Sequence, residues 1–179
     1  RFHESTGLVG SNLYVHRHRG ELFSATTQGV YRLRPGANAH FERLTGISGP
    51  TWGLASFHDT LLVANYQGMY VVDKERTEKI PYTDTALCFL NPREYPDQLL
   101  VGVRGGVMRL QLQKGKWQVR GMLPNLNDEV RTIVQEKSGD IWIGSNSTGV
   151  IRLRIRQTND GDHFEMARYG SNDGLPSQN

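Results

Sequence analysis

The chain has 179 residues, of which 22% are charged, and its formal net charge is +3. This length is sufficient for a domain with a substantial core, and the scattered, mildly basic charge excludes the dense basic run of a nucleic-acid-binding tail. No apolar run approaches the ~20 residues of a membrane-spanning helix, and Cys88, the single cysteine, excludes an internal disulfide.

The first 46 residues contain four short apolar runs separated by turn signals. The first two runs, NLYVH (12–16) and LFSA (22–25), are joined by the turn HRHRG. Gly29 then precedes VYRL (30–33), and HFERL (40–44) completes the set. Short runs joined by such turns predict strands connected by hairpins, and no helical periodicity competes with this interpretation.

The same sequence pattern recurs three more times along the chain. The glycine that follows the polar loop returns as Gly68, Gly106 and Gly149, a period near 40 residues. The run before each glycine is LLVA (61–64), LLVG (99–102) or IWIG (141–144), and the run after it is MYVV (69–72), VMRL (107–110) or VIRL (150–153).

Several positions are held in all four copies. The second run always ends in a small residue (Ala25, Ala64, Gly102, Gly144), which predicts close approach of a neighbouring sheet. The glycine after the loop suits a turn with positive φ. Trp142 occupies the position of Phe23, Leu62 and Leu100, so we interpret it as a structural core residue.

This pattern predicts an all-β protein, a β-propeller made of four-stranded antiparallel blades. The second strand is apolar on both faces, as expected for a sheet covered on both sides. The predicted blades are approximately 7–46, 47–84, 85–126 and 127–173, in a single propeller segment spanning 1–179.

The two ends of the chain share a motif, TGLVGSN (6–12) and DGLPSQN (173–179). We therefore interpret 174–179 as the start of a next blade, and the chain, which begins RFHEST, as a piece of a larger propeller. An uncovered blade face predicts self-association, and light scattering would separate a 20.2 kDa monomer from a dimer.

The string VRTIVQEKSGDIWIGSNSTGVIRL, followed by YGSNDGLPSQN, resembles the two-component regulator propeller repeat. The first repeat matches moderately, whereas the second and third lack the Trp and the linking motif. The resemblance implies a periplasmic sensor ectodomain of a bacterial inner-membrane histidine kinase or diguanylate cyclase. It implies a membrane helix and an output domain outside this chain, no catalytic residues, no cofactor, and an oligosaccharide or another small molecule as ligand.

Candidate ligand-binding residues lie in the loops that lead into each first strand and in those between the second and third strands. Aromatic rings, amides and arginines there suit a sugar or a carboxylated ligand. The candidates are Asn12, Tyr14, Trp52, Tyr66, Arg104, Arg131 and Asn146.

Other patterns favour no catalytic or metal site. His16 and His18 lack a completing ligand set, so an exposed turn is the simpler interpretation. Arg152, Arg154 and Arg156 alternate, which favours a solvated edge strand over a polyanion site, and no nucleic-acid partner is expected.

Two other functions remain as alternatives to the sensor. One is a propeller lyase of the streptogramin-lyase type, for which His40, His58 and His163 are available. The other is a scaffold that binds proteins.

Overall fold

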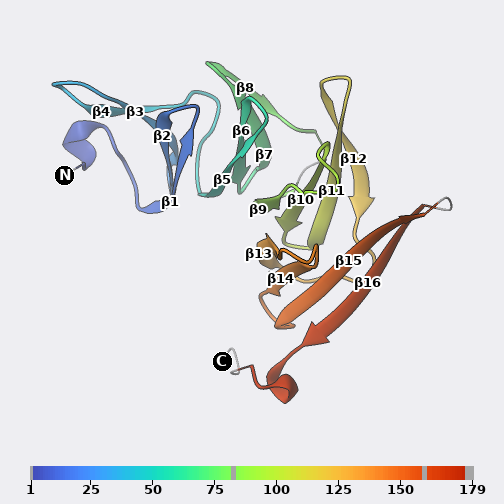
Figure 1. Cartoon of the computed structure of the whole chain (residues 1–179). Helices are drawn as coiled ribbons and strands as arrows, with labels where there is room; N and C mark the ends of the chain where they lie inside the picture. The colour runs from blue at the N-terminus through green and yellow to red at the C-terminus, as the bar shows by residue number, and fades with distance from the viewer. Residues whose placement is uncertain (1, 82–83, 159–160, 176–179) are drawn as a thin grey trace. The chain divides into compact units, whose positions relative to one another are not determined.

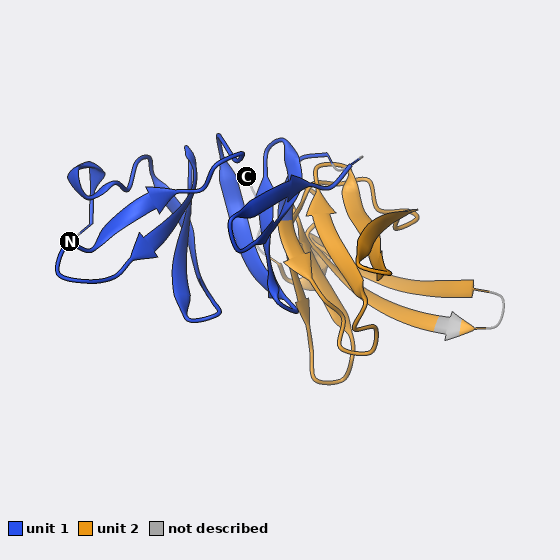
Figure 2. Cartoon of the chain, turned by 90° about the horizontal axis from the view of Figure 1, so that it is seen from above, with its two compact units in different colours: residues 1–87 blue, residues 88–179 orange. Residues whose placement is uncertain are grey.

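The computed structural model describes residues 2–81, 84–158 and 161–175. Within them, strands form four separate four-stranded antiparallel sheets (Figure 1). The chain divides into two compact units, Arg1–Leu87 and Cys88–Asn179 (Figure 2).

The first unit contains two sheets, which we call blade 1 and blade 2. The short 3₁₀ helix η1 (Glu4–Thr6) precedes them. Blade 1 consists of β1 (Asn12–His18), β2 (Glu21–Thr26), β3 (Gly29–Arg34) and β4 (His40–Arg43). Blade 2 consists of β5 (Thr51–Phe57), β6 (Thr60–Asn65), β7 (Gly68–Asp73) and β8 (Arg76–Lys79).

Blades 3 and 4 follow. Blade 3 consists of β9 (Ala86–Leu90), which begins at the end of the first unit, β10 (Gln98–Val103), β11 (Gly106–Gln113) and β12 (Lys116–Met122). Blade 4 consists of β13 (Val130–Gln135), β14 (Ile141–Ser145), β15 (Val150–Thr158) and β16 (Gly161–Tyr169), and η2 (Ser171–Asp173) follows it.

In every sheet the strands pair in chain order, so each blade is a meander. This arrangement confirms the predicted β-propeller blades. The turn signals of the sequence explain it, because consecutive antiparallel strands need only short hairpins.

Within each unit, the two blades share one apolar core. In unit 1, Phe23, Ala25 and Val30 of blade 1 pack with residues of blade 2, namely Leu54, Leu61, Val63, Tyr70 and Val72. In unit 2, Leu100 and Val107 of blade 3 pack with residues of blade 4, namely Val130, Ile133, Ile141, Ile143, Ile151 and Leu153. Neither sheet could bury its apolar face alone.

Two glycines show why the repeat keeps small residues. A Cβ at Gly102 would lie 2.4 Å from the Sγ of Cys88 and 2.8 Å from the carbonyl oxygen of Val130 on blade 4. This confirms close approach of a neighbouring sheet at Gly102. Gly106 has a φ of 129°, and the other repeat glycines (Gly29, Gly68 and Gly149) also have positive φ.

Trp142 differs from its predicted place in the core. Phe23 and Leu100 are 3% and 0% exposed, whereas Trp142 is only partly buried. Its indole Nε1 donates a hydrogen bond of 2.8 Å to Glu136, and its ring contacts that of Tyr169. The reason is that Trp142 points to the face of blade 4 opposite blade 3, which no described segment of unit 2 covers.

The arginine-rich strand was also misassigned. β15 pairs with both β14 and β16, so it is an inner strand rather than an edge. Arg154 donates two hydrogen bonds to the carboxylate of Asp140, at 2.5 and 3.0 Å. Arg154 is therefore held by a carboxylate beside its own sheet instead of being fully solvated.

Candidate functional site

The loops predicted to carry a site do share a rim in three of the blades. In each, the turn between the second and third strands donates a backbone hydrogen bond to the segment leading into the first strand. The pairs are Thr27 to Ser11 (3.0 Å), Tyr66 to Pro50 (3.0 Å) and Asn146 to Glu129 (2.8 Å).

A β-bulge marks the start of the first strand in these blades. The register shifts between Asn12 and Tyr14, and the equivalent shifts place Trp52 and Arg131 at bulges. A bulge redirects a side chain out of the regular alternation. In blade 1 the bulge position holds Leu13, and the candidate Tyr14 follows it on β1.

In unit 1 the four candidates do not form one cluster. Asn12 accepts a hydrogen bond from Ser24 at 3.2 Å, and Tyr14 is exposed on β1. Trp52 is partly buried, and the exposed Tyr66 accepts a hydrogen bond from Gln67 at 2.9 Å. Among residues 2–81, no hydrogen bond joins these four candidates to one another.

In unit 2 the structure brings its three candidates, Arg104, Arg131 and Asn146, together around Glu129. Arg131 forms an ion pair with one carboxylate oxygen of Glu129, and the Nε of Arg104 lies 4.0 Å from the other. The backbone of Asn146 binds the carbonyl of the same residue. The rim of unit 2 therefore carries two exposed guanidinium groups with one shared carboxylate.

Asp128 holds this rim in shape. One of its carboxylate oxygens accepts backbone hydrogen bonds from Ser147 (3.0 Å) and Thr148 (2.9 Å). Burial of the Asp128 carboxylate opposes its ionisation, but hydrogen bonds from Ser145, Ser147 and Thr148 outweigh burial and hold its pKa well below the ordinary value of 3.8.

Asp128→Asn is expected to lower the free energy of unfolding at pH 7 by about 2 kcal/mol, because charge-assisted hydrogen bonds are lost. The folded-state pKa is depressed, so the stabilisation is complete above the unfolded-state pKa and is lost as the pH falls below about 4. Denaturant titrations at pH 7 and pH 3 should therefore show a smaller difference between wild type and variant at pH 3. The same substitution at the exposed Asp97 is the control, and an equal difference at both pH values would contradict the assignment.

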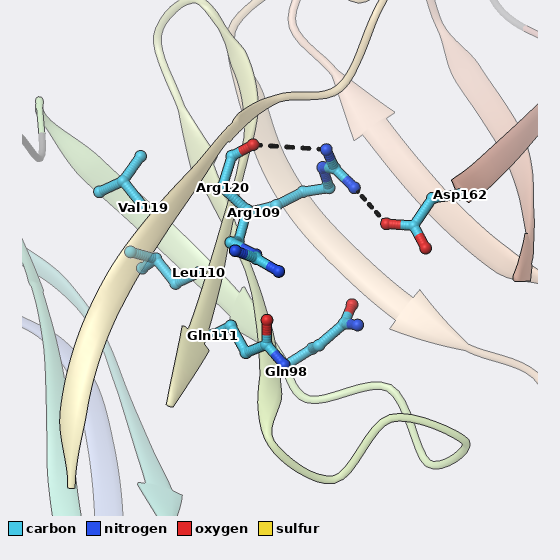
Figure 3. A pocket seen from close by; sticks show the side chains of 7 residues that line it. All are labelled: Gln98, Arg109, Leu110, Gln111, Val119, Arg120 and Asp162. Atoms are coloured by element: carbon cyan, nitrogen blue, oxygen red, sulfur yellow. Dashed lines mark hydrogen bonds and ion pairs between the residues drawn. The ribbon is translucent and has the colours of Figure 1, made fainter. Parts of the chain in front are cut away.

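A polar cleft, which sequence reasoning did not find, lies between blades 3 and 4 (Figure 3). It has a volume of about 460 Å³ and is lined by Gln98, Arg109, Leu110, Gln111, Val119, Arg120 and Asp162. Arg109 reaches across it from β11. Its Nη1 lies 2.6 Å from Asp162 on blade 4, and its Nη2 donates to the carbonyl of Arg120 at 3.4 Å.

An equivalent cleft lies between blades 1 and 2, with a volume of about 320 Å³. Here Arg32, 4% exposed, replaces Arg109, and its Nη2 lies 2.6 Å from Glu75 on blade 2. The guanidinium of Arg32 lowers the pKa of the Glu75 carboxyl. In both arginines the Nε is buried and has no hydrogen-bond partner among the described residues.

One sequence signal would have found both clefts. The residue three positions after the repeat glycine is arginine in VYRL, VMRL and VIRL. An arginine in an inner strand beside a large apolar residue requires a partner carboxylate, because a buried charge is costly without one.

The histidine pair also differs from its predicted exposed turn. His18 is 7% exposed, and both His16 and His18 lie 2.9 Å from the hydroxyl of Ser56 on blade 2. Burial, and then the neighbouring His18, lower the pKa of His16. Within the described ranges, no group of three or more His, Cys, Asp or Glu residues could hold a metal ion.

No helix in the described part of the chain is both long and apolar enough to cross a membrane. Comparison with protein families finds no matching family model, and no curated protein matches the sequence.

Solved structures do resemble this fold. One is the extracellular domain of the B. thetaiotaomicron protein BT4673, named as a one-component system in one structure and a hybrid two-component system in another. The TM-scores are 0.63 and 0.62, with 20% identity over 87% of this chain and 21% of that one. This chain thus spans about a fifth of that ectodomain.

The N-terminal domain of Nup159 is also similar, with a TM-score of 0.58 and 15% identity, covering 88% of this chain and 48% of that one. A chain of the S. cerevisiae assembly of Dbp5 with Nup159, Gle1, IP6 and ADP gives a TM-score of 0.59 and 15% identity, over 92% of this chain and 51% of that one. At these identities the likeness shows the fold alone.

Proposed function

We propose that this chain is a non-enzymatic sensory module in the ectodomain of a bacterial transmembrane signalling protein. The output, a histidine kinase or a diguanylate cyclase, lies outside these residues, and the module itself lies in the periplasm. The observation that carries the proposal is the blade sequence of the fourth repeat, together with the likeness of this fold to the BT4673 ectodomain.

The groups that the clefts and rims present support the ligand class that we propose. The cleft of unit 2 offers two guanidinium groups and two amides beside one carboxylate, and the rim adds Arg104 and Arg131. Such groups bind hydroxyl and carboxylate oxygens, which favours a small polar molecule such as an oligosaccharide. Ligand binding would alter blade geometry and so bias a two-state output.

The test is an in-frame deletion of residues 7–173 from the full-length protein in its native host. We expect the deletion to abolish the transcriptional or cyclic-nucleotide response to the inducing carbohydrate, while membrane abundance stays unchanged. An Arg120→Gln variant, which removes an exposed guanidinium from the cleft lining, is expected to reduce the response. Arg156→Gln should leave the response unaffected, since Arg156 lies outside the lining of this cleft. A normal response without residues 7–173 would refute the sensory role.

The similarity to Nup159, solved in an assembly with other proteins, favours a protein-binding scaffold as the second candidate. Crosslinking of the full-length protein in cells distinguishes the two. A scaffold predicts a stable partner whose capture is independent of any inducer.

A further inference from the structure

One face of blade 4 carries the same set of repeat positions that forms the junction between blades 1 and 2 and the junction between blades 3 and 4. We call the face that packs on the following blade the outgoing face. In blade 1 it carries Phe23, Ala25, Val30 and Arg32, and in blade 3 it carries Leu100, Gly102, Val107 and Arg109. Strand register places Trp142, Gly144, Val150 and Arg152 at the same positions in blade 4.

Each filled junction uses its arginine in the same way. Arg32 pairs with Glu75 and Arg109 with Asp162, both at 2.6 Å. Both acids belong to the following blade and lie in or beside the hairpin between its third and fourth strands. The junction therefore combines apolar packing with a specific charge pair across blades.

On blade 4 this junction has no occupant among the described residues of unit 2. Val134, the strand partner of Trp142, is 55% exposed. Among the residues that the structure describes, the one acidic group near Arg152 is Asp140 beside its own sheet, at the long distance of 3.9 Å. Blade 1 has the same contact within the blade, since Arg32 lies 3.8 Å from Glu21 of its own sheet. In blade 1, however, Arg32 also pairs with Glu75 of the following blade.

The turn after blade 4 indicates what occupies the face. Before blade 1, Thr6, Gly7 and Leu8 donate backbone hydrogen bonds to His3, Glu4 and His3. After blade 4, Asp173, Gly174 and Leu175 donate in the same pattern to Gly170, Ser171 and Gly170. Gly7 and Gly174 have nearly equal φ angles, 84° and 89°. The turn that leads into the first strand of blade 1 is thus rebuilt after the last strand of blade 4.

We propose that a fifth blade, entered through the turn Gly170–Leu175, docks on Trp142, Gly144, Val150 and Arg152, and that Arg152 pairs with an acidic side chain on the hairpin between its third and fourth strands. A second copy of the chain fits this face less well. A second copy would dock through its blade 1, in the same head-to-tail contact. The corresponding hairpin of blade 1 is RPGANA (34–39), which contains no acidic residue.

The docking test uses the full chain extended after Gln178 by a second copy of residues 130–173, which supplies its own Asp162. Val134→Cys in the original blade 4 reports exposure through its rate of maleimide labelling. Burial raises the pKa of the Cys88 thiol to about 12, so the native thiol labels slowly. Docking is expected to slow labelling by at least about tenfold relative to the unextended chain.

Charge variants test the pairing itself. Asp162→Arg in the appended copy is expected to restore fast labelling, and adding Arg152→Glu to it should slow labelling again. When residues 12–46 are appended instead, their hairpin between the third and fourth strands lacks the acid. This extension should therefore slow labelling of the introduced cysteine less. Equal labelling with and without the acid would overturn the role of Arg152, and unchanged labelling with every extension would overturn docking.

Two further measurements keep the outcome clear if the extension does not fold. In the unextended chain, Arg109→Glu and Asp162→Arg should each lower stability and together recover at least half of the loss, and failure to recover refutes the charge pair. Labelling of Val134→Cys that slows with protein concentration in the unextended chain would identify a second copy as the occupant and overturn the fifth blade.

Discussion

Gly106→Ala is expected to lower the free energy of unfolding by about 3 kcal/mol. Gly106 begins β11 with a φ of 129°, a conformation that L residues rarely adopt. A Cβ there would also lie 2.1 Å from the carbonyl oxygen of Leu126. The backbone would have to move to remove this clash, because the carbonyl oxygen of Leu126 belongs to the backbone and not to a flexible side chain.

The adjacent Gly105 provides a matched control. A Cβ at Gly105 meets no atom within 4 Å, so Gly105→Ala is expected to change stability by less than about 1 kcal/mol. Urea denaturation of the two variants, followed by far-ultraviolet circular dichroism, gives the comparison. Similar losses for both variants would show that the repeat glycine is not held by its φ or by Leu126.

The repeated sequence pattern was sufficient to predict the blades, because every blade has the same types of residue at the same positions. Short apolar runs, turn residues and a positive-φ glycine all agree at a period near 40, and such agreement specifies a meander. The environment of a repeat position was harder to predict. Trp142 and Leu100 share one position, yet only Leu100 is covered by a following blade in its own unit.

The candidate ligand-binding residues stay a prediction, and the structure shows only which of them lie close together. Arg104 and Arg131 meet at Glu129, as expected for loops on one rim, but the clefts of Arg32 and Arg109 depend on acids about 43 and 53 residues away. Those pairs form only when two blades pack together. A single repeat examined alone shows the arginine without showing which hairpin supplies its partner.

Ile143→Ala is expected to lower the free energy of unfolding by about 3 kcal/mol, because it removes a fully buried side chain from the junction between blades 3 and 4. The surrounding residues come from two sheets that are each held rigid by their own strand hydrogen bonds, so the cavity cannot collapse fully. Denaturant titration followed by tryptophan fluorescence measures the loss.

A matched pair on one strand shows that the loss depends on which face is covered. Val130 and Val134 both lie on β13, yet Val130 is 0% exposed and Val134 is 55% exposed. Val130→Ala should therefore cost about 2 kcal/mol, whereas Val134→Ala should cost less than about 0.5 kcal/mol. In the five-blade chain the cost of Val134→Ala should rise toward that of Val130→Ala, because docking converts an exposed face into a core. A cost for Val134→Ala that stays small in a chain whose labelling is protected would mean that the fifth blade shields this face without packing on it.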